Sequence, residues 1–184
     1  MSKSIKLNND TFWDSSTVSH NKKPLNDILN NVVCDYTLPE NKSYMSIPVA
    51  LEPNAVYRFE LGIVFIGAER NVFLVPNGLW DSNNCSYSFI TIQSSEIYKE
   101  QQTSASRIGL GLANSSNDYW SIFTGTIDTS YGRFNIFSQS NSINGSSVGG
   151  GRYNGDINIA SLTFISADWK DILAGAKFKM WKVG

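Results

Sequence analysis

The feature that most constrains this fold is an alternation of apolar and polar side chains every two residues. In the segment 56–63, VYRFELGI, large apolar side chains alternate with Arg58 and Glu60. Successive side chains of a β-strand point to opposite faces, so this pattern predicts a strand with one buried and one solvated face. Eight further segments have the length and composition of strands: 43–49, 71–75, 85–92, 107–112, 120–127, 133–138, 157–165 and 177–183.

Turn-forming residues separate these segments. Pro, Gly, Asn, Asp and Ser cluster between them, at 52–54, 76–78, 81–84, 114–118 and 129–132. Short strands with a turn signal every ten or so residues are typical of antiparallel sandwiches and jelly rolls. We therefore predict an all-β protein whose head is an antiparallel β-sandwich or jelly roll.

One polar, glycine-rich stretch breaks this rhythm. Residues 138–155 have the sequence SQSNSINGSSVGGGRYNG. Few of these side chains can be buried, and long connections in compact domains are either functional or disordered. We expect this stretch to be a long exposed loop.

The first 36 residues are polar and differ from the rest. They contain one segment with helical spacing, 24–31, in which Pro24 suits the first helical position. Its apolar residues Leu25, Ile28 and Leu29 follow at the spacing of one helix face. Two helical turns are not stable alone in water, so this stripe must pack on the head or on copies of itself. We predict an N-terminal arm with one short helix at 1–36 and a β-sandwich head at 37–184.

Charge and hydropathy exclude several classes of partner. Charged residues make up only 17% of the chain and the formal net charge is −1, so binding to nucleic acid through counterion release is not expected. No stretch approaches the ~20 apolar residues that span a membrane, and we see no signal peptide. Uncharged amides and hydroxyls supply most of the polarity, which suits a neutral polar partner such as a glycan. We expect a protein that is soluble in the cytoplasm where it is made.

We predict no catalytic residues, no metal ion and no cofactor. The single histidine, His20, lies in the arm without a catalytic pattern, and no metal-ligand spacing is present. Glycoside hydrolysis requires two carboxylates, and the carboxylates that could supply them all lie where turns or strand ends are expected: Asp81, Asp118, Asp128, Asp156 and Asp168. The two cysteines, Cys34 and Cys85, are expected to be buried free thiols.

The segment 7–29, LNNDTFWDSSTVSHNKKPLNDIL, resembles the N-terminal segment of tail-fibre-like and receptor-binding-like proteins of phages and prophages of Gram-positive hosts. ALEPNAVYRFEL at 50–61, GTIDTSYGRFNI at 125–136 and KFKMWKVG at 177–184 are similar to other parts of such proteins. The resemblance implies a homotrimer on a virion tail, with β-rich heads that contact cell-wall or capsular saccharide. It carries no catalytic motif and transfers no binding residue by position.

The apolar residues of the arm are the predicted attachment or trimerisation element. Phe12 and Trp13 are large apolar side chains in a polar segment, and such groups require a partner surface. We group them with Leu25, Ile28 and Leu29 as contacts to neighbouring copies or to other tail proteins. The alternative is that they fold back onto their own β-domain.

Three loop clusters have the composition of a sugar site, in which an aromatic face meets the C–H surface of the ring while amides, carboxylates and Arg bind hydroxyls. The predicted ligand-binding residues are Trp80, Asp81, Asn83 and Asn84; Asn117, Asp118 and Tyr119; and Tyr131, Arg152, Tyr153, Asn154 and Asp156. Trp80 is the foremost candidate because turn residues flank it. We expect Trp120 in the core, and Trp169 and Trp181 in the core or at an interface.

Taken together, the sequence predicts a phage tail-associated receptor-binding module that adheres to host-surface glycans without catalysis. Two alternatives stay open within a tail: a structural tail or baseplate component that binds only protein neighbours, and a polysaccharide depolymerase. A fourth reading is a bacterial lectin-like module unconnected with phage.

Overall fold

The computed structural model describes residues 4–7, 10–14, 31–67, 70–80, 83–93, 96–113, 120–142, 145–155 and 158–183. Its contacts divide the chain into two compact units, Met1–Val32 and Val33–Gly184. This division lies four residues before the predicted end of the arm, because strand β3 (Val32–Thr37), apart from its first residue, belongs to the second unit and pairs in its large sheet.

The first unit contains an antiparallel hairpin of β1 (Ser4–Leu7) and β2 (Asp10–Asp14). Phe12 and Trp13 lie on β2, where Trp13 is the cross-strand partner of Ile5. The predicted helix at 24–31 lies outside the described residues except for Asn31. The other predicted attachment residues and the histidine also lie outside them: Leu25, Ile28, Leu29 and His20.

The second unit confirms the all-β prediction. Besides β3 and the 3-10 turn η1 (Ser130–Gly132), its described elements are β4 (Tyr44–Pro48), β5 (Val56–Ile63), β6 (Arg70–Pro76), β7 (Cys85–Gln93), β8 (Glu96–Ala105), β9 (Ile108–Ala113), β10 (Ser121–Asp128), β11 (Phe134–Ser142), β12 (Gly145–Tyr153), β13 (Ser161–Ser166) and β14 (Lys177–Val183). In the part of the chain that the structure describes, no helix has the length and apolar character needed to cross a membrane.

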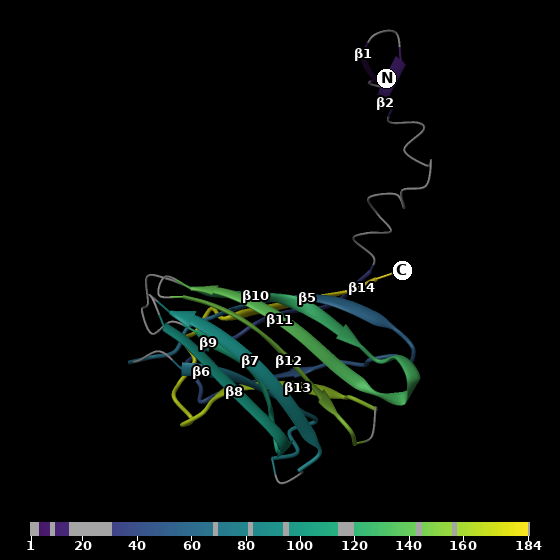
Figure 1. Ribbon diagram of the computed structural model, residues 1–184. Helices are drawn as coiled ribbons and strands as arrows, with labels where there is room; N and C mark the ends of the chain where they lie inside the picture. The colour runs from purple at the N-terminus through teal and green to yellow at the C-terminus, as the bar shows by residue number, and fades with distance from the viewer. Residues whose placement is uncertain are drawn as a thin grey trace. The chain divides into compact units, whose positions relative to one another are not determined.

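These strands form two antiparallel sheets (Figure 1), an eight-stranded sheet in the order β3-β14-β5-β10-β11-β12-β7-β8 and a four-stranded sheet in the order β4-β13-β6-β9. The pairing is nested: β3 pairs with β14, β4 with β13, β5 with β10 and β6 with β9. This is the connectivity of a jelly roll. The hairpins β7–β8 and β11–β12 are inserted into it and extend the large sheet beyond β10.

Aromatic side chains from both sheets fill the core. Phe178 on β14 packs on Phe59 of β5, with 6.0 Å between ring centroids, and on Phe164 of β13, with 5.3 Å. All three side chains are buried. Because Phe164 belongs to the small sheet and the other two to the large sheet, this cluster joins the two layers.

The prediction of a long loop at 138–155 is wrong, because these residues form most of the hairpin β11–β12. Ser138 pairs with Gly149 and Ser140 with Ser147 along a continuous register. An added Cβ at Gly149 would lie 2.3 Å from Cβ of Phe89, on the neighbouring strand β7. Glycine is therefore used here to let a strand pack closely against a large neighbour.

The two cysteines are free thiols, as predicted; Cys85 is buried, whereas Cys34 is half-buried. Burial raises the pKa of Cys85 to about 11, so about one thiol in a thousand is ionised at pH 8. Burial, together with the neighbouring Asp35, also raises the pKa of Cys34.

We expect an alkylating reagent at pH 8 to leave Cys85 unmodified in the folded protein, because its thiol is both buried and protonated. Mass spectrometry of the digested protein measures the modification at each cysteine. Denaturant should make both residues react at similar rates, which serves as the control. Rapid native labelling of Cys85 would contradict its placement in the core.

Candidate functional site

The outward-facing side chains of the large sheet are aligned in rows across neighbouring strands. One row runs through Asn135 on β11, Arg152 on β12 and Ser86 on β7. The next row runs through Phe137, Gly150, Ser88 and Gln101 on the strands from β11 to β8. Directly opposite residues in a sheet have Cβ atoms about 5 Å apart. The two rows therefore form one continuous polar surface across four strands.

A groove with a volume of about 490 Å³ lies on this surface. Gly150 contributes no side chain to the second row, in which it lies between Phe137 and Ser88. The residues that line the groove are Ser86, Tyr87, Ser88, Gln101, Gln102, Thr103, Asn135, Gly150, Gly151, Arg152 and Asn154. Phe137, the cross-strand partner of Gly150, is 51% exposed beside it.

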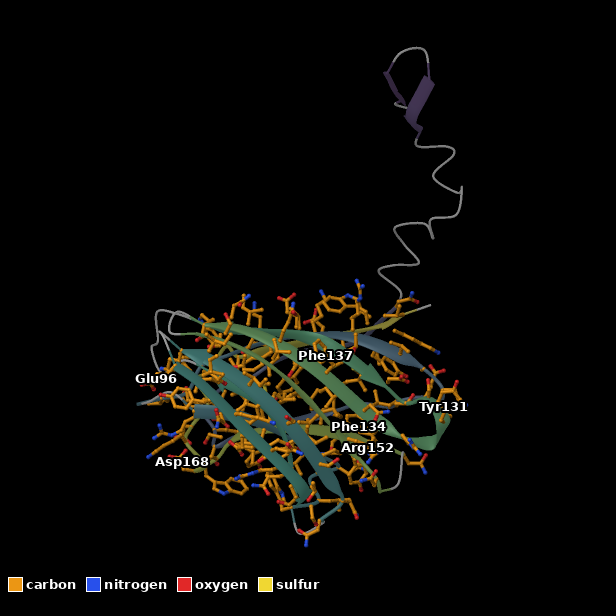
Figure 2. The ribbon with its side chains drawn as sticks, viewed as in Figure 1. Glu96, Tyr131, Phe134, Phe137, Arg152 and Asp168 are labelled. Carbon is orange, nitrogen blue, oxygen red and sulfur yellow. The ribbon has the colours of Figure 1, made fainter. Side chains whose placement is uncertain are left out.

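The chemistry of the groove is that of hydroxyls, amides and one guanidinium. Arg152 is its one formally charged lining residue, and among the described residues its side chain has no ion-pair partner. A guanidinium offers five N–H donors in a fixed plane, while Ser, Thr, Asn and Gln both donate and accept. The groove can therefore bind a ligand that presents many hydroxyl groups. Figure 2 shows Phe137 and Arg152 on the same broad sheet.

No family model and no curated protein matches this chain. The assignment of the groove therefore rests on its own geometry.

Two sequence-predicted residues, Arg152 and Asn154, line the groove, and Asn84 lies next to them. The backbone N–H of Asn154 donates to the carbonyl of Asn84 at 2.9 Å, and its side-chain Nδ2 donates to the same oxygen at 3.3 Å. The neighbouring Asn83 carbonyl accepts from Ser104 Oγ at 3.3 Å. Part of the third predicted cluster and part of the first thus meet at one end of β7 and β12.

Tyr131 occupies the tip of the β10–β11 connection and is 93% exposed. Its φ of 56° is uncommon for a bulky residue. Surrounding contacts fix this turn: Asn54 Oδ1 accepts from the Tyr131 backbone N–H at 3.2 Å, and the Thr129 hydroxyl donates to the Glu52 carbonyl at 2.7 Å. Tyr131 is available to a ligand, although it does not line the groove.

Tyr153 is buried, which differs from the exposed position that the prediction of a ligand-binding residue requires. Its side chain is only 2% exposed and belongs to the core. It alternates along β12 with the exposed Arg152 and therefore points to the opposite face of the sheet.

Trp80, the foremost predicted residue, is half-buried and does not line the groove. Its ring packs on Trp169, with centroids 4.6 Å apart, and against the core. Trp169 itself is 49% exposed and has a φ of 58°. Arg70 and Asp168 form an ion pair at 2.8 Å beside it, which anchors the turn.

The prediction that Trp120 is a core residue is wrong, because it is 37% exposed. It does alternate with Ile122, as the sequence indicates, but both side chains lie on the solvent side while Ser121 and Phe123 are buried. Trp169 is likewise outside the core, and its role at an interface stays a prediction; Trp181 is half-buried. The remaining predicted site residues lie outside the described part of the chain: Asp81, Asn117, Asp118, Tyr119 and Asp156.

Two of the carboxylates considered for glycoside hydrolysis are described, and both anchor turns. Hydrogen bonds from the Ser130 side chain and backbone lower the pKa of Asp128. Burial would raise the pKa of Asp168, but the Arg70 guanidinium together with hydrogen bonds from the Asp168 backbone and Ser166 lowers this pKa below its usual value. A general acid in this reaction requires a raised pKa. Because their pKa values are lowered, the Asp128 and Asp168 carboxylates stay ionised, and an ionised carboxylate suits a role in anchoring a turn.

Proposed function

We propose that this chain is a phage tail-associated receptor-binding module, and that the groove on its large sheet adheres to host-surface glycans without catalysis. The observation that carries the proposal is the combination of Arg152, amides and hydroxyls in an open groove beside the exposed ring of Phe137. An aromatic ring can contact the C–H face of a sugar while the polar side chains bind its hydroxyls.

The tail location and the trimeric state rest on a resemblance to tail-fibre-like and receptor-binding-like proteins. The segments that carry this resemblance are 7–29, 50–61, 125–136 and 177–184. An open groove on a sheet face binds weakly on its own. Three copies that engage one polysaccharide at once would gain avidity by factors of about 10²–10⁴ over a single groove. A repetitive cell-wall or capsular polymer offers the repeated ligand that this mode requires.

We expect Arg152→Ala to weaken binding to the recognised polysaccharide by about tenfold or more, since a hydrogen bond to a charged group contributes about 1.5–3 kcal/mol. Binding is measured by biolayer interferometry against a panel of immobilised Gram-positive wall and capsular polysaccharides. Arg58→Ala is the matched control: it removes the same charge from the exposed face of β5, outside the groove. Both variants should keep the parent melting temperature within a few degrees.

Equal losses in the two variants would show that net charge, not the groove, determines adhesion. Shortening of the polysaccharide during the incubation, detected by size-exclusion chromatography, would show that the protein is a depolymerase and would overturn the proposal of adhesion without catalysis. If the parent protein binds none of the polymers, the proposal of a glycan-binding module is overturned.

A second candidate, a structural tail or baseplate component, is favoured by one observation. A cluster of exposed aliphatic side chains borders the groove: Ile90, Ile92, Ile97 and Val148. Ile90 is the cross-strand partner of Val148, and Ile92 that of Ile97, so the four side chains are contiguous. Exposed apolar clusters mark protein–protein contacts. Indifference to every polysaccharide, combined with binding to a tail protein, would favour this candidate.

A further inference from the structure

A second hollow lies on the other half of the large sheet. Its volume is about 580 Å³, within the range of ligand pockets. It is lined from β3, β14, β5 and β10 together with Trp120 just before β10 and Gly175 just before β14. The groove is lined from β11, β12, β7 and β8 together with Asn154 just beyond β12. The two sites share no residue, so each can be tested separately.

Two glycines shape this pocket. Gly62 lies between Lys177 and Ile122 in the sheet register, and an added Cβ there would have no atom within 4 Å. Gly175, with a φ of +90°, lies against the Trp120 ring, whose nearest carbon would be 3.7 Å from an added Cβ. Gly62 therefore forms an open floor, and Trp120 forms an aromatic wall.

Four charged side chains surround the floor. Lys179 Nζ forms an ion pair with Asp35 at 3.3 Å. In the described part of the chain, Glu60 and Lys177 form no ion pair within the 4.0 Å that defines one. The pocket thus presents one carboxylate and one ammonium of its own beside an aromatic face, with no net charge. Glu60 would repel a polyanion, and Lys177 would repel a polycation.

We propose that this pocket is a second ligand site, which binds one zwitterionic amino-sugar unit. The sugar ring stacks on Trp120, its ammonium group faces Glu60, and its acidic group faces Lys177. An aromatic ring next to a carboxylate is favourable for an ammonium group. This inference rests on the proposed function. The groove binds neutral hydroxyl groups of a glycan, and this pocket adds recognition of the two charges on one sugar unit.

The test uses muramic acid, an amino sugar that carries both a free amine and a carboxylate, titrated into uniformly ¹⁵N-labelled full-length protein. The indole N–H signals of the five tryptophans are followed by NMR, and Trp120→Phe assigns the signal of interest. We expect a saturable shift of the Trp120 signal at ligand concentrations on the order of 10 mM. Glucosamine and N-acetylmuramic acid, which each carry one of the two charges, should bind more weakly.

Gly62→Val is the decisive variant, because it fills the floor with a β-branched side chain that suits a strand, at a site with free space. We expect it to weaken muramic acid binding about tenfold or more without lowering the melting temperature. Thr126→Val on β10, outside the pocket, is the matched control on the same face and should bind as the parent does.

The charge variants add a specific signature. Glu60→Gln should weaken muramic acid and glucosamine but not N-acetylmuramic acid, and Lys177→Gln should weaken the two acids but not glucosamine. A static Trp120 signal, or unchanged binding in a folded Gly62→Val protein, overturns the second site. Loss of polysaccharide binding in Arg152→Ala concerns the groove alone, so the two proposals fail independently.

Discussion

Gly149→Ala is expected to destabilise the head by about 3 kcal/mol or more, although a single methyl group is all that it adds. The new Cβ would lie 2.3 Å from Cβ of Phe89 and 3.0 Å from its Cα, where neither the backbone nor the base of the side chain can move freely. Both residues are buried between paired strands. The expected result is a large decrease in the denaturant midpoint, measured by tryptophan fluorescence during urea unfolding.

The matched control is Gly62→Ala in the same sheet, where no atom lies within 4 Å of the added methyl. Alanine restricts the unfolded chain more than glycine does, so this variant should be neutral or more stable by up to about 1 kcal/mol. The two substitutions are chemically identical, and the difference between them isolates the contact with Phe89. Equal midpoints for the two variants would contradict the tight β12–β7 packing.

Phe178→Ala is expected to cost about 4 kcal/mol, the usual magnitude for a fully buried phenylalanine. Its ring is in contact with Phe59 and Phe164, so its removal opens a cavity between the two sheets. Domains of this size are stable by only about 5–15 kcal/mol, so this variant should have a much lower melting temperature and fold marginally. Calorimetry or circular dichroism during heating measures the change.

Phe137→Ala provides the comparison for Phe178→Ala. Phe137 lies on the exposed face of β11, and its loss should change stability by less than about 1 kcal/mol. A cost for Phe178→Ala no larger than that for Phe137→Ala would show that the two sheets are not held together through the Phe59–Phe178–Phe164 cluster.

The sequence predicts best those strands that have one apolar and one polar face. Strand β5 has the predicted bounds, Val56–Ile63, because the large apolar residues between its ends all face the core. Strand β8, Glu96–Ala105, was not predicted, since most of its side chains are exposed and the apolar alternation is absent. Strand β12 was not predicted, because glycine is depleted in strands. The close fit of this strand with β7 depends on a pairing partner more than fifty residues away.

The candidate site is less predictable than the fold. Aromatic residues in turns were favoured, yet the groove lies on the face of a sheet and is lined largely by Ser, Gln and Gly residues within strands. A local signal for Phe137 is present, because it lies between Asn135 and Gln139 on the polar face of β11. Its proximity to Ser88 requires the pairing of β12 with both β11 and β7, which no local pattern specifies.

The nested strand pairing has a kinetic consequence. Leu38 donates its N–H to the carbonyl of Ala176 at the junction of β3 and β14, so segments about 140 residues apart must meet. Domains dominated by such distant contacts have high contact order and fold in milliseconds to seconds, because loop closure must precede the gain from pairing. Until β14 inserts, β3 and β5 both present unpaired edges that can pair with other chains. Synthesis of this protein should therefore be most vulnerable to aggregation just before residues 177–183 become available.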